Sequence, residues 1–455
     1  MRILFNLLRR LRRDVTGNVA VTFAIVCVPL ISAVGCGVDY SRYNQMRAKL
    51  QAAIDAASVG AVSRTSPAFI AAGTMTSDGV INVGNDDATK IFNGNMAGVG
   101  GYTLNSFTPE VKKTGAILTA KVSFSGTMPT MFMGMVGFKT MALQGWSKAT
   151  ATMPKYIDFY LLLDNSPSMG VAATPDDVTK MVNATSDAKY GSNRYCAFAC
   201  HDYNDSNNFY NLAKSIGATT RIDVLRTATQ QLMDTAVQTQ TYSNQFRMAI
   251  YDFGAASKTI GLRALFSLSS SLSSAKSAAG NIDLMGVYGN NDSYTGDKDT
   301  PYTSVFPAIN NEISATGDGT SGSPLKYLFF VSDGVADESN TGCLKTMKNS
   351  TFGNISPRCQ SPLNPALCKT LKDRGVKIAV LYTTYLQLPT NSWYMSWIDP
   401  FNKGPFGPSP NSEIAQNMKA CASDGFYFEV SPTQGISDAM NTLFKKAVAD
   451  AHIAG

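Results

Sequence analysis

The longest uncharged stretch of the chain is the apolar run Val15–Val38. Its 24 residues, at about 1.5 Å per residue, make a helix long enough to cross a hydrocarbon core of about 30 Å. Pro29 lies inside the run but does not exclude a span, because neighbouring groups satisfy the backbone that it frees. Apolar residues then continue at helical spacing, at Tyr43, Met46, Leu50, Ile54 and Ala57. The pattern predicts one helix over residues 15–62, whose first part spans a membrane.

The next region, residues 63–153, shows a different period. Pro67 disfavours helical geometry at the residue before it, so the long helix should end in Ser63–Pro67. Ala116–Ser125 alternates apolar and polar side chains, which predicts a half-buried strand, and "KTMALQGWSKATATM" at 139–153 predicts another. We therefore expect a small β-rich region behind a membrane helix, a plan typical of pilin-like proteins, with no catalytic constellation.

Residues 154–455 alternate apolar strand patterns with amphipathic helix patterns. Predicted strands are "YIDFYLLLD", "FRMAIYDFG", "LKYLFFVSDG", "VKIAVLYTTY" and "GFYFEV". Predicted helices are "RIDVLRTATQQLMDTAV", "TSVFPAINNEIS", "NPALCKTLKDRG" and "ISDAMNTLFKKAVADA". This alternation predicts an α/β domain with a doubly wound, mainly parallel sheet covered on both faces.

Two of the predicted strands end in candidate ligands for a cation. The first is followed by "DNSPSM", which places Asp164, Ser166 and Ser168 at alternate positions, and Asp333 follows a later strand. Ligands bind such sheets at the carboxyl ends of their strands. The residues therefore form either an ordinary turn or an oxygen-rich site for a divalent cation.

Composition and charge narrow the class of protein. Of 455 residues, 44% are hydrophobic and 16% charged, which indicates a folded protein. Five of the 39 basic residues precede the apolar run, and the remaining 34 face 33 acidic residues, so no basic domain for nucleic acid remains. The five are Arg2, Arg9, Arg10, Arg12 and Arg13. They make residues 1–14 a cytoplasmic basic tail, with everything after Tyr40 outside the inner membrane.

Two kinds of processing compete with an uncleaved anchor. "AVGC" partly matches a lipoprotein cleavage box, but a mature lipoprotein usually begins with a flexible tether, whereas here a helix continues. "GNVAVTF" resembles the start of a type IV prepilin, but Thr22 stands where those proteins usually carry Glu. We therefore expect the N-terminus to be kept.

The N-terminal segments "GNVAVTFAI" and "GVDYSRYNQMRAKLQAAIDAAS", within about residues 14–62, resemble the TadE/TadG family of the tight-adherence (Flp) pilus machinery. The long C-terminal part is similar to the TadG-like branch. The resemblance implies an inner-membrane-anchored, pilin-like component of pilus assembly and surface attachment. Other pilus assembly or pilin-like proteins are its implied partners. The sequence does not determine whether any part reaches the cell surface.

Residues of about 155–450 resemble a von Willebrand factor type A domain. Its metal-ion-dependent adhesion site combines D-x-S-x-S after the first strand, a threonine before a helix and an aspartate after a later strand. The resemblance assigns these roles to Asp164, Ser166, Ser168, Thr303 and Asp333. The stretch before Thr303 is longer than is usual in the family, and Thr300 is the substitute.

The implied cofactor is Mg²⁺, with Mn²⁺ or Ca²⁺ as alternatives. Mg²⁺ prefers oxygen ligands and usually keeps several waters. Hydroxyl groups are neutral, so they leave the metal more electrophilic than carboxylates would. A water-filled position could then accept an Asp or Glu side chain of a partner protein.

The cysteines fall into three groups. Cys196 and Cys200 lie in an insertion at about 171–219, and we expect a disulfide between them. Haem is disfavoured because three residues separate the cysteines, and zinc because four good ligands are not visible. Four later cysteines allow three pairings, namely among Cys343, Cys359, Cys368 and Cys421. Cys27 and Cys36 in the apolar run are expected to be free.

Three functions are compatible with these features. The favoured one is a binding and assembly protein of the Flp pilus, which is not an enzyme. A pilus-independent envelope adhesin or scaffold is the alternative. A Mg²⁺-dependent hydrolase is disfavoured because Ser166 has no evident base, the two histidines, His201 and His452, lie in no nucleophile motif, and no P-loop occurs.

Overall fold

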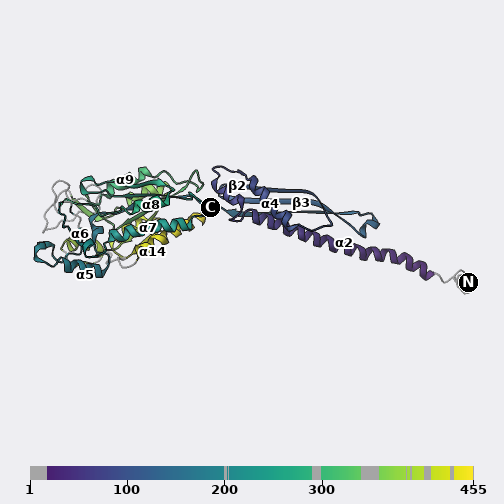
Figure 1. Cartoon of the computed structure of the whole chain (residues 1–455), viewed down its shortest axis with the longest axis horizontal. Helices are drawn as coiled ribbons and strands as arrows, with labels where there is room; N and C mark the ends of the chain where they lie inside the picture. The colour runs from purple at the N-terminus through teal and green to yellow at the C-terminus, as the bar shows by residue number, and fades with distance from the viewer. Residues whose placement is uncertain are drawn as a thin grey trace, which may run out of the picture. The chain divides into compact units, whose positions relative to one another are not determined.

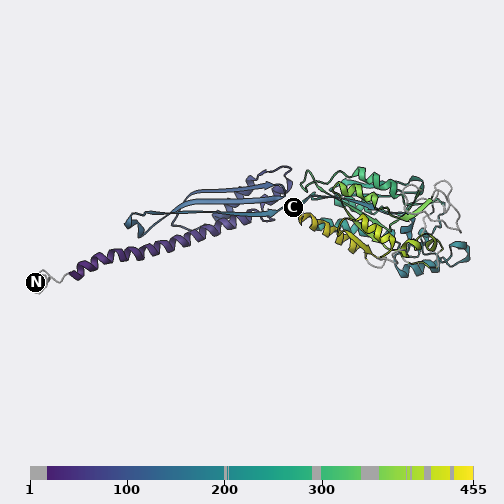
Figure 2. The same ribbon diagram turned by 180° about the vertical axis from the view of Figure 1, so that it is seen from behind.

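The computed structural model describes residues 18–198, 202, 204–288, 299–339, 358–385, 387–389, 392–403, 411–430 and 435–453. The chain forms two compact units, Met1–Met153 (unit 1) and Pro154–Gly455 (unit 2). Figures 1 and 2 show the elements of each unit from two sides.

Unit 1 begins with the 44-residue helix α2 (Asn18–Ala61), which contains Pro29. By length and composition, α2 is able to cross a membrane, and its most apolar 18-residue window has a mean hydropathy of 2.3 with only 6% buried. The second half behaves differently, because Leu50, Ile54 and Ala57 are fully buried. The first part of the helix is therefore apolar and exposed, whereas its second part contributes side chains to the core of unit 1. Its end at Ala61 agrees with the helical period of the sequence.

The second half of α2 packs against β3 and β4 of a four-stranded antiparallel sheet in the order β1-β2-β3-β4. The strands are β1 (Gly79–Val80), β2 (Thr103–Thr114), β3 (Ile117–Pro129) and β4 (Thr140–Thr152). A short 3-10 helix, η1 (Met133–Val136), lies in the β3–β4 loop. Two further helices, α3 (Pro67–Thr74) and α4 (Asn82–Asn95), were not predicted. Gly84 of α4 explains part of this, because glycine weakens the helical pattern in the sequence. In the fold the same glycine lets α4 approach α3, since an added Cβ would lie 2.7 Å from the Cβ of Ala68.

Unit 2 contains a six-stranded sheet in the order β12-β11-β8-β5-β6-β7. Every neighbouring pair is parallel except β6 and β7. The strands are β5 (Ile157–Leu163), β6 (Phe246–Asp252), β7 (Arg263–Ser269), β8 (Leu325–Ser332), β11 (Lys377–Thr383) and β12 (Tyr427–Val430). A separate hairpin pairs β9 (Val335–Ser339) with β10 (Arg358–Pro362). The predicted α/β class with a doubly wound, mainly parallel sheet is confirmed.

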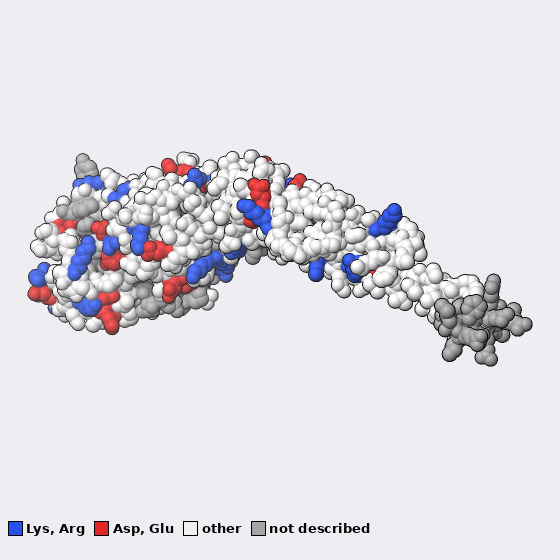
Figure 3. All heavy atoms as spheres, turned by 45° about the vertical axis from the view of Figure 1, so that its right-hand side comes forward, with Lys and Arg blue, Asp and Glu red and all other residues white. Residues whose placement is uncertain are grey.

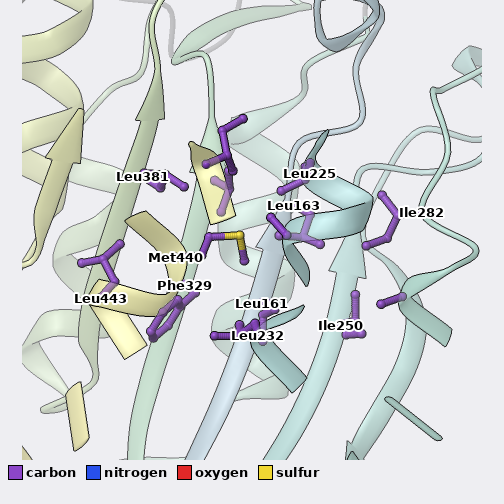
Figure 4. Packing of buried hydrophobic residues seen from close by; sticks show 14 of the residues in the cluster. Leu161, Leu163, Leu225, Leu232, Ile250, Ile282, Phe329, Leu381, Met440 and Leu443 are labelled. Atoms are coloured by element: carbon purple, nitrogen blue, oxygen red, sulfur yellow. The ribbon is translucent and has the colours of Figure 1, made fainter. Parts of the chain in front are cut away.

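Both faces of this sheet are buried. The longer helices are α5 (Pro175–Ala184), α7 (Arg221–Thr239), α8 (Leu272–Ala279), α9 (Tyr302–Glu312), α10 (Ala366–Asp373), α13 (Glu413–Cys421) and α14 (Ile436–Ile453). The shorter ones are α6 (Phe209–Ser215), α11 (Ser392–Trp397) and α12 (Asp399–Lys403), together with the 3-10 helices η2 (Pro167–Gly170), η3 (Ala188–Asn193) and η4 (Ser257–Thr259). Helices α7 and α14 pack on one face, where Leu225 and Leu232 of α7 lie beside Leu163 and Leu161 of β5, and Leu443 of α14 lies beside Phe329 of β8 (Figure 4). Helices α9, α10 and α13 pack on the other, against Tyr160 and Leu162.

Strand β7 shows why some elements of unit 2 escaped prediction. Its residues are exposed or half-buried, and it is the antiparallel edge of the sheet. An edge strand with one weakly buried face carries little hydrophobic pattern. Helices α5 and α6, which were also not predicted, fall inside the predicted insertion at 171–219.

Six of the eight cysteines lie in the described residues. Cys368 of α10 and Cys421 at the end of α13 form a disulfide with a Cα–Cα distance of 5.3 Å, one of the three pairings that the sequence left open. Cys27 and Cys36 of α2 are free thiols, as expected. Cys359 lies in β10. Cys343 and Cys200 fall outside the described residues.

Cys196 differs from the expected arrangement in that its thiol is free, while Cys200, the other cysteine of the expected disulfide, lies outside the described residues. Its sulfur contacts the backbone two residues later: it accepts a hydrogen bond from the N–H of Phe198 at 3.4 Å and lies 3.6 Å from the Phe198 carbonyl oxygen. Burial raises the pKa of this thiol. Backbone pairing of Val171 with Phe198 holds this part of the insertion.

Candidate metal site

The loop that carries Asp164 leaves the centre of the sheet. All seven residues of β5 are buried. The backbone N–H of Asp164 still donates to the Val331 carbonyl of β8 at 2.9 Å, so the ladder continues by one residue before the chain turns. Asn165 then fixes the turn from the other side, because its amide oxygen accepts from the Phe253 N–H at 3.1 Å and its amide nitrogen donates to the Gly254 carbonyl at 2.8 Å. The position of the loop is therefore set by both neighbouring strands.

Within this loop the three predicted oxygen ligands are in contact. Oδ1 of Asp164 accepts from the backbone N–H of Ser166 at 2.9 Å and from its hydroxyl at 2.6 Å. The hydroxyl oxygens of Ser166 and Ser168 lie 3.0 Å apart. Asp164 and Ser166 are fully buried, and Ser168 is half-buried. The alternate spacing thus produces a short row of oxygens that ends at the more accessible serine.

Asp333 comes from β8, the neighbour of β5, and is also fully buried. The residue before it, Ser332, donates its hydroxyl to Oδ2 of Asp164 at 2.6 Å and bonds to the Tyr302 hydroxyl at 2.6 Å. Burial, and then repulsion from Asp333, raise the pKa of Asp164 to about 7. Burial also raises the pKa of Asp333. Two buried carboxyl groups that follow adjacent strands therefore lie at one edge of the sheet, where ionisation of one disfavours ionisation of the other.

One carboxylate oxygen of Asp333 lacks a hydrogen bond of ordinary geometry. Its Oδ1 accepts a long hydrogen bond of 3.5 Å from the Val335 N–H, and its Oδ2 has no hydrogen bond of ordinary geometry within the described part of the chain. The hydroxyls of Ser168 and Tyr385 and the charge of Arg221 lower its pKa but do not overcome burial. A buried oxygen in this state is costly unless a cation or water meets it. This observation makes the residues compatible with a divalent cation.

The predicted threonine is placed at the same edge but has another partner. Thr303 lies in the first turn of α9, and its backbone N–H and hydroxyl both donate to Oε2 of Glu338, at 3.0 and 2.5 Å. The substitute, Thr300, pairs through its backbone with Asp337 of β9. Helix α9 does reach the site, because its Tyr302 bonds to Ser332. The hydroxyl of Thr303, however, is engaged by Glu338, and its role as a ligand stays a prediction.

Sequence reasoning missed Arg221, the first residue of α7. Its side chain is fully buried, and its Nη2 donates to the Thr384 carbonyl at 2.5 Å. The guanidinium carbon lies 5.2 Å from the centroid of the Tyr385 ring, while Nε and Nη1 have no hydrogen bond in the residues that the structure describes. It is the nearby positive charge that favours the ionised form of Asp333. An arginine opening an amphipathic helix is typical of a solvated position, so the sequence carried no signal for it.

The chemistry of the site follows from its donor set. Among the described residues, no three His, Cys, Asp or Glu side chains gather into a metal site. A cation here would depend on two carboxylates and on serine hydroxyls, which suits a hard ion such as Mg²⁺. Its charge would also remove the repulsion between Asp164 and Asp333.

We expect the metal-free protein to lose stability as the pH rises from about 4 to about 8. The pKa of Asp164 is about 7 in the fold against an ordinary value of 3.8, so the folded state holds the proton more tightly than the unfolded state. The resulting stability is fully present below pH ~4 and is lost as the pH rises through ~7. Melting temperatures in chelator across this range measure the effect. Asp164→Asn, which cannot ionise, should flatten the fall; a fall of the same size in this variant would contradict the assignment.

Comparison with known protein families gives a match for the N-terminal part of the chain. Residues 17–64 match the family model described as "Putative Flp pilus-assembly TadE/G-like". The match covers the whole of α2, both its exposed apolar part and its buried part. This region of the chain is therefore of the TadE/G-like pilus-assembly kind, a class associated with the cell envelope. No curated protein matches the chain.

Solved structures show only a distant likeness. The vWF domain of the type V pili tip protein Mfa5 from Porphyromonas gingivalis has 9% identity and a TM-score of 0.35, over 66% of this chain and 97% of that one. The PilB minor pilin from Streptococcus sanguinis has 10% identity and a TM-score of 0.32, over 77% and 78%. Proximal thread matrix protein 1 from the mussel byssus has 11% identity and a TM-score of 0.30, over 66% and 46%. At these values the likeness carries no argument about function.

Proposed function

We propose that this protein is a membrane-anchored component of Flp pilus assembly and surface adhesion. In this proposal unit 2 is a von Willebrand factor type A domain that binds partners through a divalent cation. The match at residues 17–64 supports the pilus class. The observation that carries the binding function is the meeting of Asp164 and Asp333, both fully buried, beside two serine hydroxyls at the carboxyl ends of β5 and β8.

Helix α2 supplies the anchor in this proposal. Its first half has apolar side chains that the described residues of unit 1 leave exposed, such as Phe23, Ile25 and Val28. The arginines before it favour a cytoplasmic N-terminus, which leaves the sheets of both units in the periplasm. A reporter that is active only in the periplasm, fused after residue 455, tests this orientation.

The binding chemistry assigns a distinct task to each side chain. Asp164 and Asp333 supply negative charge and orient the site, directly or through water, while Ser166 and Ser168 add neutral oxygens. Thr303 would join them after exchanging its contact with Glu338. When bound, the cation supplies an electrophilic position for a carboxylate of the partner protein. Partners of this kind are pilus or pilin-like proteins with an exposed Asp or Glu.

We expect capture of envelope proteins by the immobilised full-length chain to depend on both Mg²⁺ and Asp164. Removal of either eliminates the position that a partner carboxylate occupies, so the amount captured should fall at least about tenfold. Quantitative mass spectrometry of the eluates, in Mg²⁺ or in chelator, measures the change. The matched control is Asp373→Ala, which removes an exposed carboxylate of α10 and should behave as the parent. Equal capture of the same proteins in chelator would refute metal-dependent binding.

A further inference from the structure

We propose that the β3–β4 loop of unit 1, residues 130–139, inserts into the lipid interface beside α2 and holds the sheet of unit 1 against the bilayer. This loop, "TMFMGMVGFK", is called the membrane loop below. The inference rests on the proposed span by α2. It goes beyond it by assigning a second, separate contact with phospholipid.

The membrane loop exposes an unusual amount of apolar surface. Its eight residues from Met131 to Phe138 carry no charge. Met135 is 80% exposed, Met131 66% and Phe138 63%, and Val136 is also exposed. Scattered exposed apolar residues are ordinary, but a contiguous group of this kind marks a binding surface for protein or lipid. The core of unit 1 gains nothing from these side chains, so their partner lies outside the unit.

The loop is fastened to α2 at one specific level. The carboxylate of Asp39, which is fully buried, accepts hydrogen bonds from the backbone N–H groups of Met131, Phe132 and Met133 at 2.8–2.9 Å. One turn earlier, the ring of Phe132 lies against Gly35, where an added Cβ would be 2.5 Å from the Phe132 Cβ. Figures 1 and 2 show this end of the sheet beside the middle of α2. The depth of the loop is therefore coupled to that of the helix.

The level of attachment is the end of the predicted span. Gly35 is one of the last residues of the apolar run, and Asp39 is the first charged residue after it. A run of 24 helical residues slightly exceeds a hydrocarbon core of about 30 Å, so Gly35 lies near the outer boundary of that core. A loop packed on Gly35 must then lie at the depth of the headgroups and the first acyl carbons.

The residues around the loop suit a lipid interface. Tyr40 and Tyr43 stack on α2 just beyond Asp39, with ring centroids 6.3 Å apart. Aromatic rings of this kind gather at membrane–water interfaces. Lys139 closes the loop on its exposed side, where its ammonium group can reach lipid phosphates.

Lipid is a better fit than a second protein because the part of α2 on which the loop packs also exposes apolar side chains. Val34 and Val38 are exposed there, on the segment that the bilayer itself would cover. Charged side chains elsewhere on the molecule are interspersed in sign on the face drawn in Figure 3. The uncharged, apolar surface of the membrane loop is thus a local feature, found at the end of the sheet that packs on α2.

The test uses the full-length chain in nanodiscs of phosphatidylethanolamine and phosphatidylglycerol, with a photo-reactive benzophenone amino acid at one position. Position 135 reports on the loop and position 28 on the spanning helix. Position 114 lies at the opposite end of the sheet, about 40 Å away along β3. We expect lipid adducts at 28 and 135, in at least about tenfold excess over position 114.

The outcomes separate this inference from the proposed anchor. Adducts at 28 but not at 135 would refute the membrane loop and leave the anchor intact. An absence of adducts at 28 would refute the anchor. A covalent dimer formed from position 135, in place of a lipid adduct, would show that the loop contacts a second copy of the chain and would also refute the inference.

A second variant tests the fastening by Asp39. Asp39→Ala removes the acceptor of three backbone N–H groups, so the loop should detach from α2 and the adduct at 135 should fall severalfold. The matched control is Asp55→Ala, which removes an exposed carboxylate of the same helix. Equal adduct yields in the two variants would overturn the role of Asp39 in setting the depth of the loop.

Discussion

Asp164→Ala is expected to abolish divalent-cation binding and, with it, all stabilisation of unit 2 by Mg²⁺. A ligand that binds only the folded state stabilises it by about 2.7 kcal/mol at a concentration of 100 times its dissociation constant. The variant should show no such gain, because Asp164 is the carboxylate at the centre of the row formed with Ser166 and Ser168. In chelator at pH 8 the variant should be about as stable as the parent. Loss of the repulsion with Asp333 offsets the loss of hydrogen bonds from Ser166 and Ser332.

Calorimetric titration with Mg²⁺ and thermal unfolding with and without chelator measure these effects. Asp373→Ala is again the control, since its carboxylate pairs with Lys369 on the surface and such pairs contribute at most about 1 kcal/mol. Equal stabilisation of the variant and the parent by Mg²⁺ would exclude Asp164 as a ligand. If the parent binds no divalent cation, the adhesion mechanism fails and the DNSPSM segment is an ordinary buried turn.

The double variant Cys368→Ala/Cys421→Ala is expected to lose about 4 kcal/mol of unfolding free energy under non-reducing conditions. The disulfide closes a loop with a sequence separation of 53 residues, and both cysteines are fully buried. Its removal therefore restores conformational freedom to the unfolded chain and also removes packing volume between α10 and α13. Urea unfolding of unit 2, followed within the full-length protein, measures the loss.

The control for this variant is Cys27→Ser/Cys36→Ser, which changes two free thiols of α2. It should leave the unfolding of unit 2 unchanged. A loss below about 1 kcal/mol in the alanine double variant would show that the bridge contributes little beyond ordinary core packing. Reducing agent should bring the parent toward the alanine variant and leave the variant itself unaffected.

The parts of the fold that were predictable are those with strong and long periodic patterns. Strands β5, β8 and β11 are mostly apolar, since both faces of the sheet are covered. Helices α7 and α14 show one apolar side because only one side meets the sheet. In each case the burial pattern repeats along the element's own short stretch of sequence, so the pattern is visible without knowledge of the fold.

The unpredicted parts depend on contacts between distant segments. Helix α4 is rich in Gly and Asn, and its stability comes from packing on α2 and α3. Arg221 is buried where the start of α7 meets Thr384 and Tyr385, which follow β11. Glu338 occupies the hydroxyl of Thr303 from a strand 35 residues away. Nothing in the residues adjacent to Arg221 or Glu338 in the sequence indicates these contacts.

By itself, the sequence of this protein determined the apolar helix, the doubly wound sheet and the row of oxygens after β5, because period and spacing are local properties. Only the tertiary structure decided which groups share an environment. It buried both carboxylates, which raises the pKa of each, and placed Asp333 beside Asp164, whose pKa it raises further. It paired Cys368 with Cys421 and left Cys196 free. It also fastened an apolar loop to Asp39, 92 residues earlier in the chain. Charge repulsion, covalent pairing and burial are interactions through space, and chain order alone does not specify them.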